Sequence, residues 1–216
     1  MKTVFVNPER CIGCKQCQIA CAVEHSENKD IYSAVFEPVT PRPRILVAPG
    51  LYFNTSFPNK CRHCDPAPCL HVCPTGAISR DEEHNIVCVD GRKCITCAMC
   101  AMVCPFDVLT FYPLPSINPQ KPVALKCDQC SDRQQQGKVP VCVEACKVNA
   151  LEFGDLNELI KKSRTHLARE VSVAVGEIKP PTTKVPAHVE SWRQWGEAVD
   201  RMNSERAEGG SDDNEN

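Results

Sequence analysis

Short alternating apolar stretches punctuate residues 1–155, and each one runs into a segment rich in cysteine. The stretches TVFV and IVCV alternate in the manner of short β-strands. Two pairs of longer segments resemble each other at a constant offset or with one insertion: 3–21 with 86–104, and 60–78 with 126–151. Short strands between turn-rich loops, present twice, predict an α+β fold with an internal repeat.

The pattern changes to helical spacing after residue 155. Asp155 followed by Glu158 is a typical helix start, and apolar residues then recur on one face at Leu156, Leu159, Ile160 and Leu167. The alternation in residues 171–175 predicts an edge strand, and the proline-rich residues that follow it predict a linker. Residues 156–186 are therefore expected to form a helix, an edge strand and a linker outside the repeated region.

A second amphipathic helix is predicted for residues 187–206. Four apolar residues fall at helical spacing there, namely Val189, Trp192, Val199 and Met202. This helix can pack on its own chain or dock onto another subunit, and the pattern leaves both interpretations open. The acidic residues 207–216 predict a disordered tail.

Composition narrows the chemistry. The chain of 216 residues has 17 Cys and 18 Pro but only 7 Phe, 3 Tyr and 2 Trp, with a formal net charge of −2. Its first residues lack the apolar run and the twin arginine of an export signal, so we expect a cytoplasmic location. Thiols there stay reduced and bind metal rather than form disulfides. Neither a membrane span nor a nucleic-acid surface is expected, because the sequence has no long apolar run and no basic patch.

Sixteen of the cysteines fall in four groups, which are Cys11, Cys14, Cys17 and Cys21; Cys61, Cys64, Cys69 and Cys73; Cys94, Cys97, Cys100 and Cys104; and Cys127, Cys130, Cys142 and Cys146. A structural zinc ion usually takes two separate C-x2-C pairs. Here three closely spaced cysteines can hold three corners of a four-iron cluster while the fourth serves another cluster, and Pro74 and Pro105 match the C-P ending of that motif. The spacing therefore predicts four [4Fe-4S] clusters rather than zinc.

Three further residues are potential ligands by type. Cys88 aligns with Phe5 of the repeat and lies outside every group, which favours a small buried apolar side chain. His63 and His71 lie inside the second group, but no cysteine is missing there. They are expected to be loop residues that can donate hydrogen bonds and tune a reduction potential.

With these groups in view, the sequence resembles the four-cluster ferredoxin-type electron-transfer subunits of multi-subunit oxidoreductases. The resemblance covers residues 3–155 and is especially close in the fourth group, KCDQCSDRQQQGKVPVCVEAC, which includes Arg133, Gly137 and Pro140. It implies two bacterial-ferredoxin-like domains within residues 1–155, followed by a C-terminal helical extension. The repeat by itself would also allow the first group to pair with the second.

The resemblance implies instead that the outer two groups pair and the inner two groups pair. The implied ligand sets are Cys11, Cys14, Cys17 and Cys146; Cys21, Cys127, Cys130 and Cys142; Cys61, Cys64, Cys69 and Cys104; and Cys73, Cys94, Cys97 and Cys100. Some members of this family lack one cysteine of the third group and carry a three-iron cluster. Cys97 is present here, so four complete clusters are implied.

The expected function is electron transfer without catalysis. Four cysteines close the coordination of each cluster and leave no open metal position for a substrate. The resemblance implies a catalytic oxidoreductase subunit as partner, with tungsten aldehyde oxidoreductase as the first choice and carbon monoxide dehydrogenase, hydrogenase or formate dehydrogenase next. A flavin- or nucleotide-binding reductase subunit and a second copy of this chain are further expected partners.

Three alternatives belong to other classes. A free-standing polyferredoxin would carry the same clusters without a permanent partner. A scaffold with structural zinc would be colourless, whereas a cluster protein is brown. A self-sufficient reductase would need a flavin or nucleotide motif, and the sequence offers none.

Overall fold

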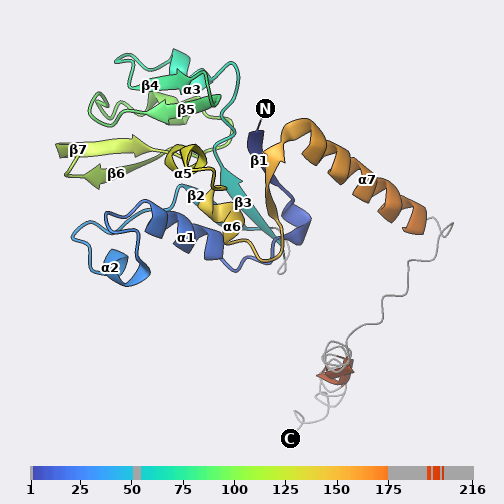
Figure 1. Cartoon of the computed structure of the whole chain (residues 1–216). Coiled ribbons are helices and arrows are strands. Elements are labelled where there is room, and N and C mark those ends of the chain that lie inside the picture. Colours follow the sequence, from blue (N-terminus) through green and yellow to red (C-terminus); the bar gives the residue numbers. More distant parts are fainter. Residues whose placement is uncertain (1, 51–54, 175–193, 196, 200, 202–216) are drawn as a thin grey trace, which may run out of the picture. The chain divides into compact units, whose positions relative to one another are not determined.

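The computed structural model describes residues 2–50, 55–174, 194–195, 197–199 and 201 (Figure 1). Its strands form four two-stranded antiparallel sheets. The pairs are β1 (Lys2–Val6) with β8 (Leu151–Asp155), β2 (Ile45–Pro49) with β3 (Ser56–Lys60), β4 (Ile78–Asp81) with β5 (Ile86–Val89), and β6 (Thr110–Leu114) with β7 (Asn118–Leu125).

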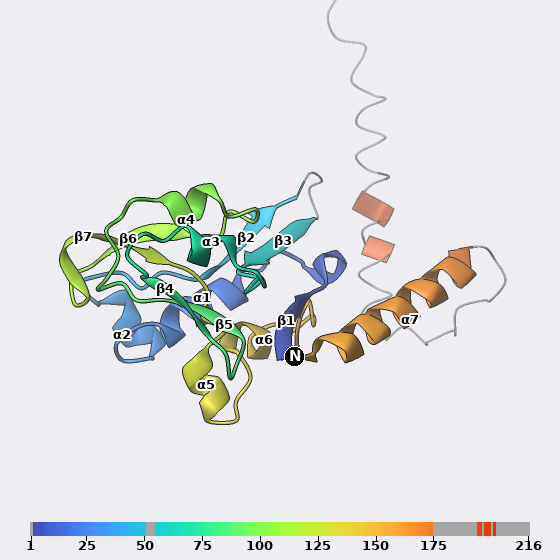
Figure 2. The same ribbon diagram turned by 90° about the horizontal axis from the view of Figure 1, so that it is seen from above.

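The helices of the cysteine-rich part are short. They are the 3-10 helix η1 (Pro8–Arg10), α1 (Gln16–Glu24), α2 (Ile31–Val35), α3 (Pro68–His71), α4 (Met99–Met102), α5 (Ser131–Gln135) and α6 (Val141–Glu144). Helix α1 contacts α6, and the small helices α3 and α4 contact each other (Figure 2). The predicted class, a mixture of helices and strands, is confirmed.

Two of the sheets join segments in an equivalent way. Strand β8 pairs with β1, which brings the two ends of the cysteine-rich part together, whereas β4 pairs with its neighbour β5. The amide of Asn7 donates to the carbonyl of Ala150 at 2.8 Å, and the amide of Asp90 donates to the carbonyl of Ala77 at 2.7 Å. Ala77 and Ala150 are both buried, as is the residue that follows each of them. The same junction therefore occurs twice.

The buried residues form three clusters, and cysteines belong to each of them. The members are Val4, Cys17, Cys21, Ile45, Cys142 and Leu151; Ala67, Ile78, Val87, Cys100, Leu109 and Ala124; and Cys61, Val108 and Cys127. Thiols thus take the place of core aliphatic side chains, which fits a chain with few aromatic residues.

The four cysteine loops share one backbone feature. The second residue after the first cysteine has a positive φ in every loop, at Gly13 (69°), His63 (51°), Thr96 (62°) and Gln129 (57°). Only glycine adopts this left-handed conformation without steric cost. Three of the four loops therefore hold a side chain in a conformation that their surroundings must stabilise.

Helix α7 (Leu156–Ala174) corrects one prediction from the sequence. Residues 171–174 continue this helix and do not form an edge strand. An isolated strand would leave its backbone groups without partners, whereas a continued helix satisfies them internally, so the weak strand preference of valine is overridden.

The start of α7 agrees with its prediction. Asp155 accepts from the amides of Asn157 at 3.0 Å and Glu158 at 3.4 Å, as an N-cap residue does. Of the predicted apolar stripe, Leu159 is buried but Leu167 is 60% exposed. The compact unit that holds the cysteine loops extends to Arg164.

Most of the C-terminal region lies outside the described residues. Residues 194–195, 197–199 and 201 are helical, and Trp195 is exposed. The remainder of the predicted helix 187–206, with Val189, Trp192 and Met202, and the predicted tail 207–216 lie outside the described part of the chain. Within the described residues, no helix combines the length and apolar character that crossing a membrane requires.

Candidate metal sites

The fold gathers the sixteen grouped cysteines into four sets of four, and each set combines loops that are separate in sequence. We name them site one (Cys11, Cys14, Cys17, Cys146), site two (Cys21, Cys127, Cys130, Cys142), site three (Cys61, Cys64, Cys69, Cys104) and site four (Cys73, Cys94, Cys97, Cys100). All seventeen cysteines lie in the described part of the chain, and none forms a disulfide.

Site one joins the start of α1 to the end of α6. Burial raises the pKa of the Cys17 thiol to about 11, and the negative charges of Cys146, Cys11 and Cys14 add to this rise. Mutual repulsion of this kind requires the four sulfurs to lie close together. The left-handed Lys15 before α1 turns the chain so that Cys14 stays exposed while Cys17 points into the core.

Site two is the most deeply buried of the four. Burial raises the pKa of Cys21 to about 12, and Cys127 and Cys130 raise it further. Burial also raises the pKa of Cys142 well above its ordinary value, with added repulsion from Cys127, Cys21 and Cys130. Without a positive counter-charge these thiols would stay protonated, so the site favours a cationic metal centre that displaces the protons.

Site three surrounds a cavity. Its four cysteines line the cavity together with apolar residues that include Val87, Val108 and Leu109. Burial raises the pKa of the Cys69 thiol, and the charges of Cys61 and Cys104 act in the same direction. The second and third loops therefore share this site.

Site four surrounds a second cavity with the remaining cysteines of those two loops. Ile78, Val89 and Phe111 complete its apolar lining. Burial raises the pKa of Cys100 to about 11, and the charges of Cys94, of Cys69 from site three, and of Cys97 also raise it. Cys97 is exposed, so this site approaches the surface of the protein.

Backbone amides point at several of the sulfurs. The amides of Arg44, His63 and Gln129 donate to the sulfurs of Cys21, Cys61 and Cys127 at 3.2, 3.4 and 3.3 Å. Donors of this kind stabilise thiolates and the sulfur atoms of iron–sulfur clusters. They also explain the positive φ of His63 and Gln129, which turns each amide toward the preceding cysteine.

A buried histidine supplies an independent test of fit. The Val87 amide donates to Nδ1 of His63 at 3.1 Å, so the neutral ring carries its proton on Nε2. That Nε2 atom is buried and has no hydrogen-bond partner among the described residues, and His63 lines the cavity of site three. A sulfide acceptor in this cavity would satisfy it, so the residues fit an iron–sulfur cluster. His71, by contrast, is exposed at the end of α3.

Cys88 lies apart from the four sites. It occupies β5 opposite Ser79 and is half-buried, not fully buried as its alignment with Phe5 predicts. It lines neither of the cavities of sites three and four.

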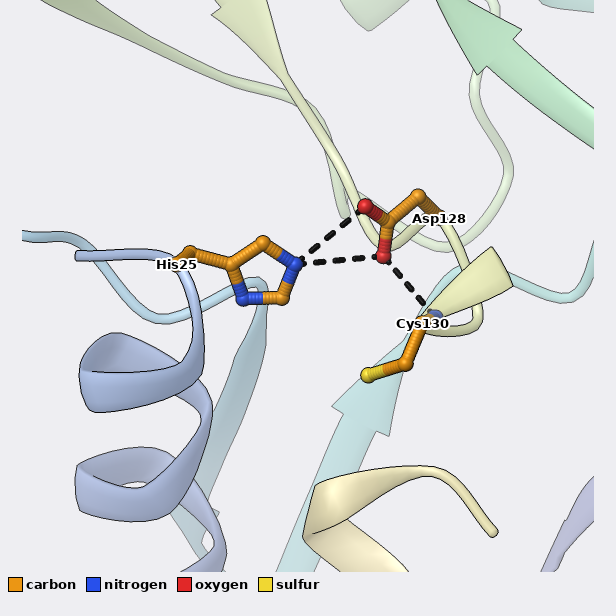
Figure 3. A group of neighbouring side chains, drawn as sticks. All are labelled: His25, Asp128 and Cys130. Atoms are coloured by element: carbon orange, nitrogen blue, oxygen red, sulfur yellow. Dashed lines mark hydrogen bonds and ion pairs between the residues drawn. The ribbon is translucent and has the colours of Figure 1, made fainter. Parts of the chain in front are cut away.

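A charged group beside site two is not evident from the sequence. Nε2 of His25 lies 3.2 Å from both carboxylate oxygens of Asp128, and the Cys130 amide donates to the same carboxylate at 3.0 Å (Figure 3). Arg44 also donates to Asp128. Burial alone would raise the pKa of Asp128, but these donors and charges hold it below its ordinary value. The only sequence signal is an acidic residue inside a cysteine loop.

His25, Asp128 and Cys130 could by themselves hold a metal ion, because their ligand atoms lie within 4.8 Å of one another. The sulfur of Cys130 already belongs to site two, and its thiol is raised in pKa to about 11 by burial first and by the charges of Asp128 and Cys127 next. We therefore treat His25 and Asp128 as residues that support the fourth loop.

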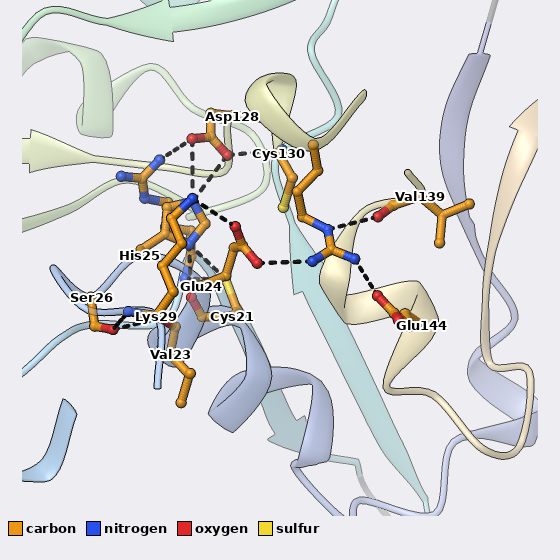
Figure 4. Close-up of polar contacts among 12 residues, drawn as sticks. Cys21, Val23, Glu24, His25, Ser26, Lys29, Asp128, Cys130, Val139 and Glu144 are labelled. Carbon is orange, nitrogen blue, oxygen red and sulfur yellow. Dashed lines mark hydrogen bonds and ion pairs between the residues drawn. The ribbon is translucent and has the colours of Figure 1, made fainter. Parts of the chain in front are cut away.

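Arg133 ties the fourth loop to α1. Its Nη1 lies 3.0 Å from the carboxylate of Glu24, and the same guanidinium contacts Glu144 of α6 (Figure 4). Lys29 reaches Glu24 from the exposed side at 3.1 Å. This network fixes the relative placement of the three elements that supply sites one and two.

Known proteins resemble this chain over most of its length. An iron–sulfur protein of Rhodospirillum rubrum is 36% identical over 177 residues, which span 78% of this chain and 90% of the relative. The electron transport protein HydN of Escherichia coli K12 is 38% identical over 165 residues, covering 72% of this chain and 89% of HydN. The chain belongs to the family of iron–sulfur electron-transfer proteins.

Further matches refine this membership. A sequence model described as a 4Fe-4S dicluster domain matches residues 52–156. The thiosulfate reductase electron transfer subunit PhsB of Salmonella typhi is 39% identical over 151 residues, covering 69% of this chain and 73% of PhsB. The predictions of [4Fe-4S] clusters and of an electron-transfer role are thus confirmed at the level of the family.

Proposed function

We propose that this family member is a non-catalytic electron-transfer subunit that carries four [4Fe-4S] clusters, one in each of sites one to four. The observation that carries the proposal is the gathering of sixteen cysteines into four sets of four. The lining of two cavities by four cysteines each supports sites three and four. The mutual repulsion of thiols supports sites one and two.

When bound, such clusters accept and release single electrons. The chain's own residues bind them, exclude water and direct donors at their sulfurs. Apolar side chains such as Ile78 and Leu109 surround sites three and four. The amides of Arg44, His63 and Gln129 are aimed at thiol sulfurs. Burial and hydrogen bonding are the properties by which proteins set cluster potentials.

We also propose that residues 1–155 are two ferredoxin-like halves related by duplication. Sites one and two belong to the first half, and sites three and four to the second. The equivalent strand pairs β1–β8 and β4–β5 support this proposal, as do the matched hydrogen bonds to Ala150 and Ala77. The positive φ shared by all four loops supports it as well.

Metal analysis of the anaerobically purified full-length protein tests the cluster content. We expect about sixteen irons and as many sulfides per molecule, from four irons in each of four sites. A protein loaded with zinc, or with half of this iron, would overturn the proposal.

The proposed setting is a cytoplasmic complex with a catalytic oxidoreductase. Relatives named for thiosulfate reductase, as its electron transfer subunit, and for anaerobic dimethyl sulfoxide reductase support a catalytic partner in general. A tungsten aldehyde oxidoreductase stays the first prediction from the sequence, and a flavin- or nucleotide-binding reductase stays a second predicted partner. Anaerobic co-purification from the native cell tests these, and a protein that purifies alone would favour a free-standing polyferredoxin.

Residues 187–206 are proposed to dock onto another subunit or onto a second copy of this chain. Trp195 is exposed in the described part of this segment, and aromatic residues often carry much of the binding energy at interfaces. Deletion of residues 187–216, followed by native mass spectrometry, should reduce the assembly size. Unchanged assembly in a truncated protein that keeps its iron would contradict the docking.

A further inference from the structure

Each cysteine loop follows directly on a basic residue, and the structure divides these four residues into two kinds. Arg10 and Lys93 precede sites one and four, and their side chains are 36% and 62% exposed. Arg10 pairs with Glu152 at 3.3 Å, and Lys93 lies 4.0 Å from a carboxylate oxygen of Asp90. Both are ordinary surface cations.

Lys60 and Lys126 hold the same sequence position but are buried. Their relative exposures are 1% and 4%. They precede Cys61 and Cys127, which pack in one buried cluster with Val108, so that sites two and three meet there. Burial of an ammonium group is costly unless an opposite charge lies nearby.

The acceptors of Lys126 are two carbonyl oxygens and a thiol. Its Nζ donates to the carbonyl of Val87, to the carbonyl of Cys127 at 3.1 Å, and toward the sulfur of Cys61 at 3.7 Å. None of the acceptors that the structure describes for this ammonium is a carboxylate. Lys126 therefore stands next to site two in sequence but contacts a sulfur of site three.

Lys60 acts in the opposite direction. Its Nζ donates to the carbonyl of Cys61 at 3.0 Å, within the loop of site three. Burial raises the pKa values of Cys127 and Cys142, and the positive charge of Lys60 opposes both rises. Each buried lysine is thus attached to one site and directs its charge at thiols of the other.

We propose that Lys60 and Lys126 are tuning residues that raise the reduction potentials of the clusters held in sites two and three. The inference rests on the proposed function, which places an anionic cluster in each site. An added electron increases the negative charge of a cluster, and a fixed ammonium in a medium of low dielectric constant stabilises that charge. Arg10 and Lys93, exposed to solvent and paired, provide little of this stabilisation.

Redox titration of the anaerobically purified full-length protein, followed by electron paramagnetic resonance, tests the proposal. We expect Lys126→Met to lower the reduced-to-oxidised ratio of one cluster about tenfold at a given applied potential, which corresponds to about 59 mV. Lys60→Met should act similarly on a different cluster. Lys93→Met, a lysine in the equivalent position that is exposed, is the matched control and should change each ratio less than twofold.

Two further variants separate charge from packing. Lys126→Gln keeps a hydrogen-bond donor without the charge and should show the same fall as Lys126→Met. Lys126→Arg keeps the charge and should stay within twofold of the unmodified protein. If Lys126→Met does not take up clusters, the contrast between the Gln and Arg variants decides the proposal. Equal ratios in those two variants would overturn it.

The exchange between sites is tested by marking each cluster. Cys64→Ser alters the signal of site three, and that signal should be the one that moves in Lys126→Met. Cys130→Ser marks site two, whose signal should move in Lys60→Met. Full iron content with no shift in either lysine variant would overturn the tuning role and leave the proposed function standing. Absence of iron from the unmodified protein would instead overturn the proposed function itself.

Discussion

The half of the molecule with sites one and two is tied together by ion pairs across long sequence distances, whereas the half with sites three and four is closed locally. Arg133 pairs with Glu24 across 109 residues, while Arg80 donates to the carbonyl of Cys64 across 16. Loop-closure entropy grows with the logarithm of loop length, so the longer closure costs about 1.7 kcal/mol more. The ion pairs lie where that cost must be offset.

The two halves also differ in how they surround their thiols. In the first half, α1 and α6 pack two sites into one apolar cluster with Cys21 and Cys142 buried. In the second half, helices of four residues, α3 and α4, leave Cys97 exposed. Ligand loss should therefore disturb the fold more in the first half than in the second.

Replacement of a buried ligand should have the largest effect. Cys142→Ala removes a thiol of site two from the first apolar cluster, so we expect loss of about a quarter of the iron and a marked loss of folded protein. Cys97→Ala should alter the cluster of site four but leave most of the protein folded. Anaerobic iron analysis and thermal unfolding by circular dichroism compare them. Equal destabilisation by both would remove the distinction between the halves.

Removal of the long-range ion pair should have the next largest effect. Arg133→Met takes the partner from Glu24 and Glu144 and should lower the stability by about 1–3 kcal/mol, because Glu24 and Arg133 are largely buried. Lys29→Met is the control, since Lys29 pairs with the same Glu24 from a side chain that is 53% exposed. It should cost less than about 0.5 kcal/mol. Chemical denaturation midpoints give both values, and a larger loss in the control would contradict the account.

The corresponding contact in the second half should matter less. Arg80→Met removes hydrogen bonds to the Cys64 carbonyl and to Asn85, and should cost about 1 kcal/mol. The loop it braces is short in sequence and is also held by the packing of Ala67 and Ile78. The same denaturation experiment applies. A loss that exceeds that of Arg133→Met would reverse the order of the two halves.

The smallest effect is expected at the seventeenth cysteine. Cys88 lies in β5 and lines neither of the cavities of sites three and four. Cys88→Val should therefore keep all of the iron and change the stability by less than about 1 kcal/mol. Loss of about four irons in anaerobic metal analysis would show that Cys88 is a ligand after all.

The cysteine spacing predicted much of the site because clusters require several thiolates at short intervals. Local capping chemistry likewise predicted the helix start at Asp155. The prediction failed at residues 171–174, where β-branched residues alternate but no neighbouring strand pairs with them in the described part of the chain. Local propensity cannot decide such a case without knowledge of the tertiary partner.

Contacts between distant segments could not be predicted from local patterns. His25, Arg44 and Asp128 converge only after the first and fourth loops meet. Lys60 and Lys93 both precede a cysteine, and nothing in their sequence context shows that one is buried and the other exposed. Burial of charge depends on which elements close over it.

The grouping of the cysteines is the central claim, and iron anomalous diffraction from anaerobic crystals of the full-length protein tests it most directly. We predict four separate four-iron centres, with Cys17 and Cys146 at one, Cys21 and Cys142 at its neighbour, Cys69 and Cys104 at a third, and Cys73 and Cys100 at the fourth. A centre shared by cysteines of the first and second loops, or a site with a single metal ion, would contradict the account.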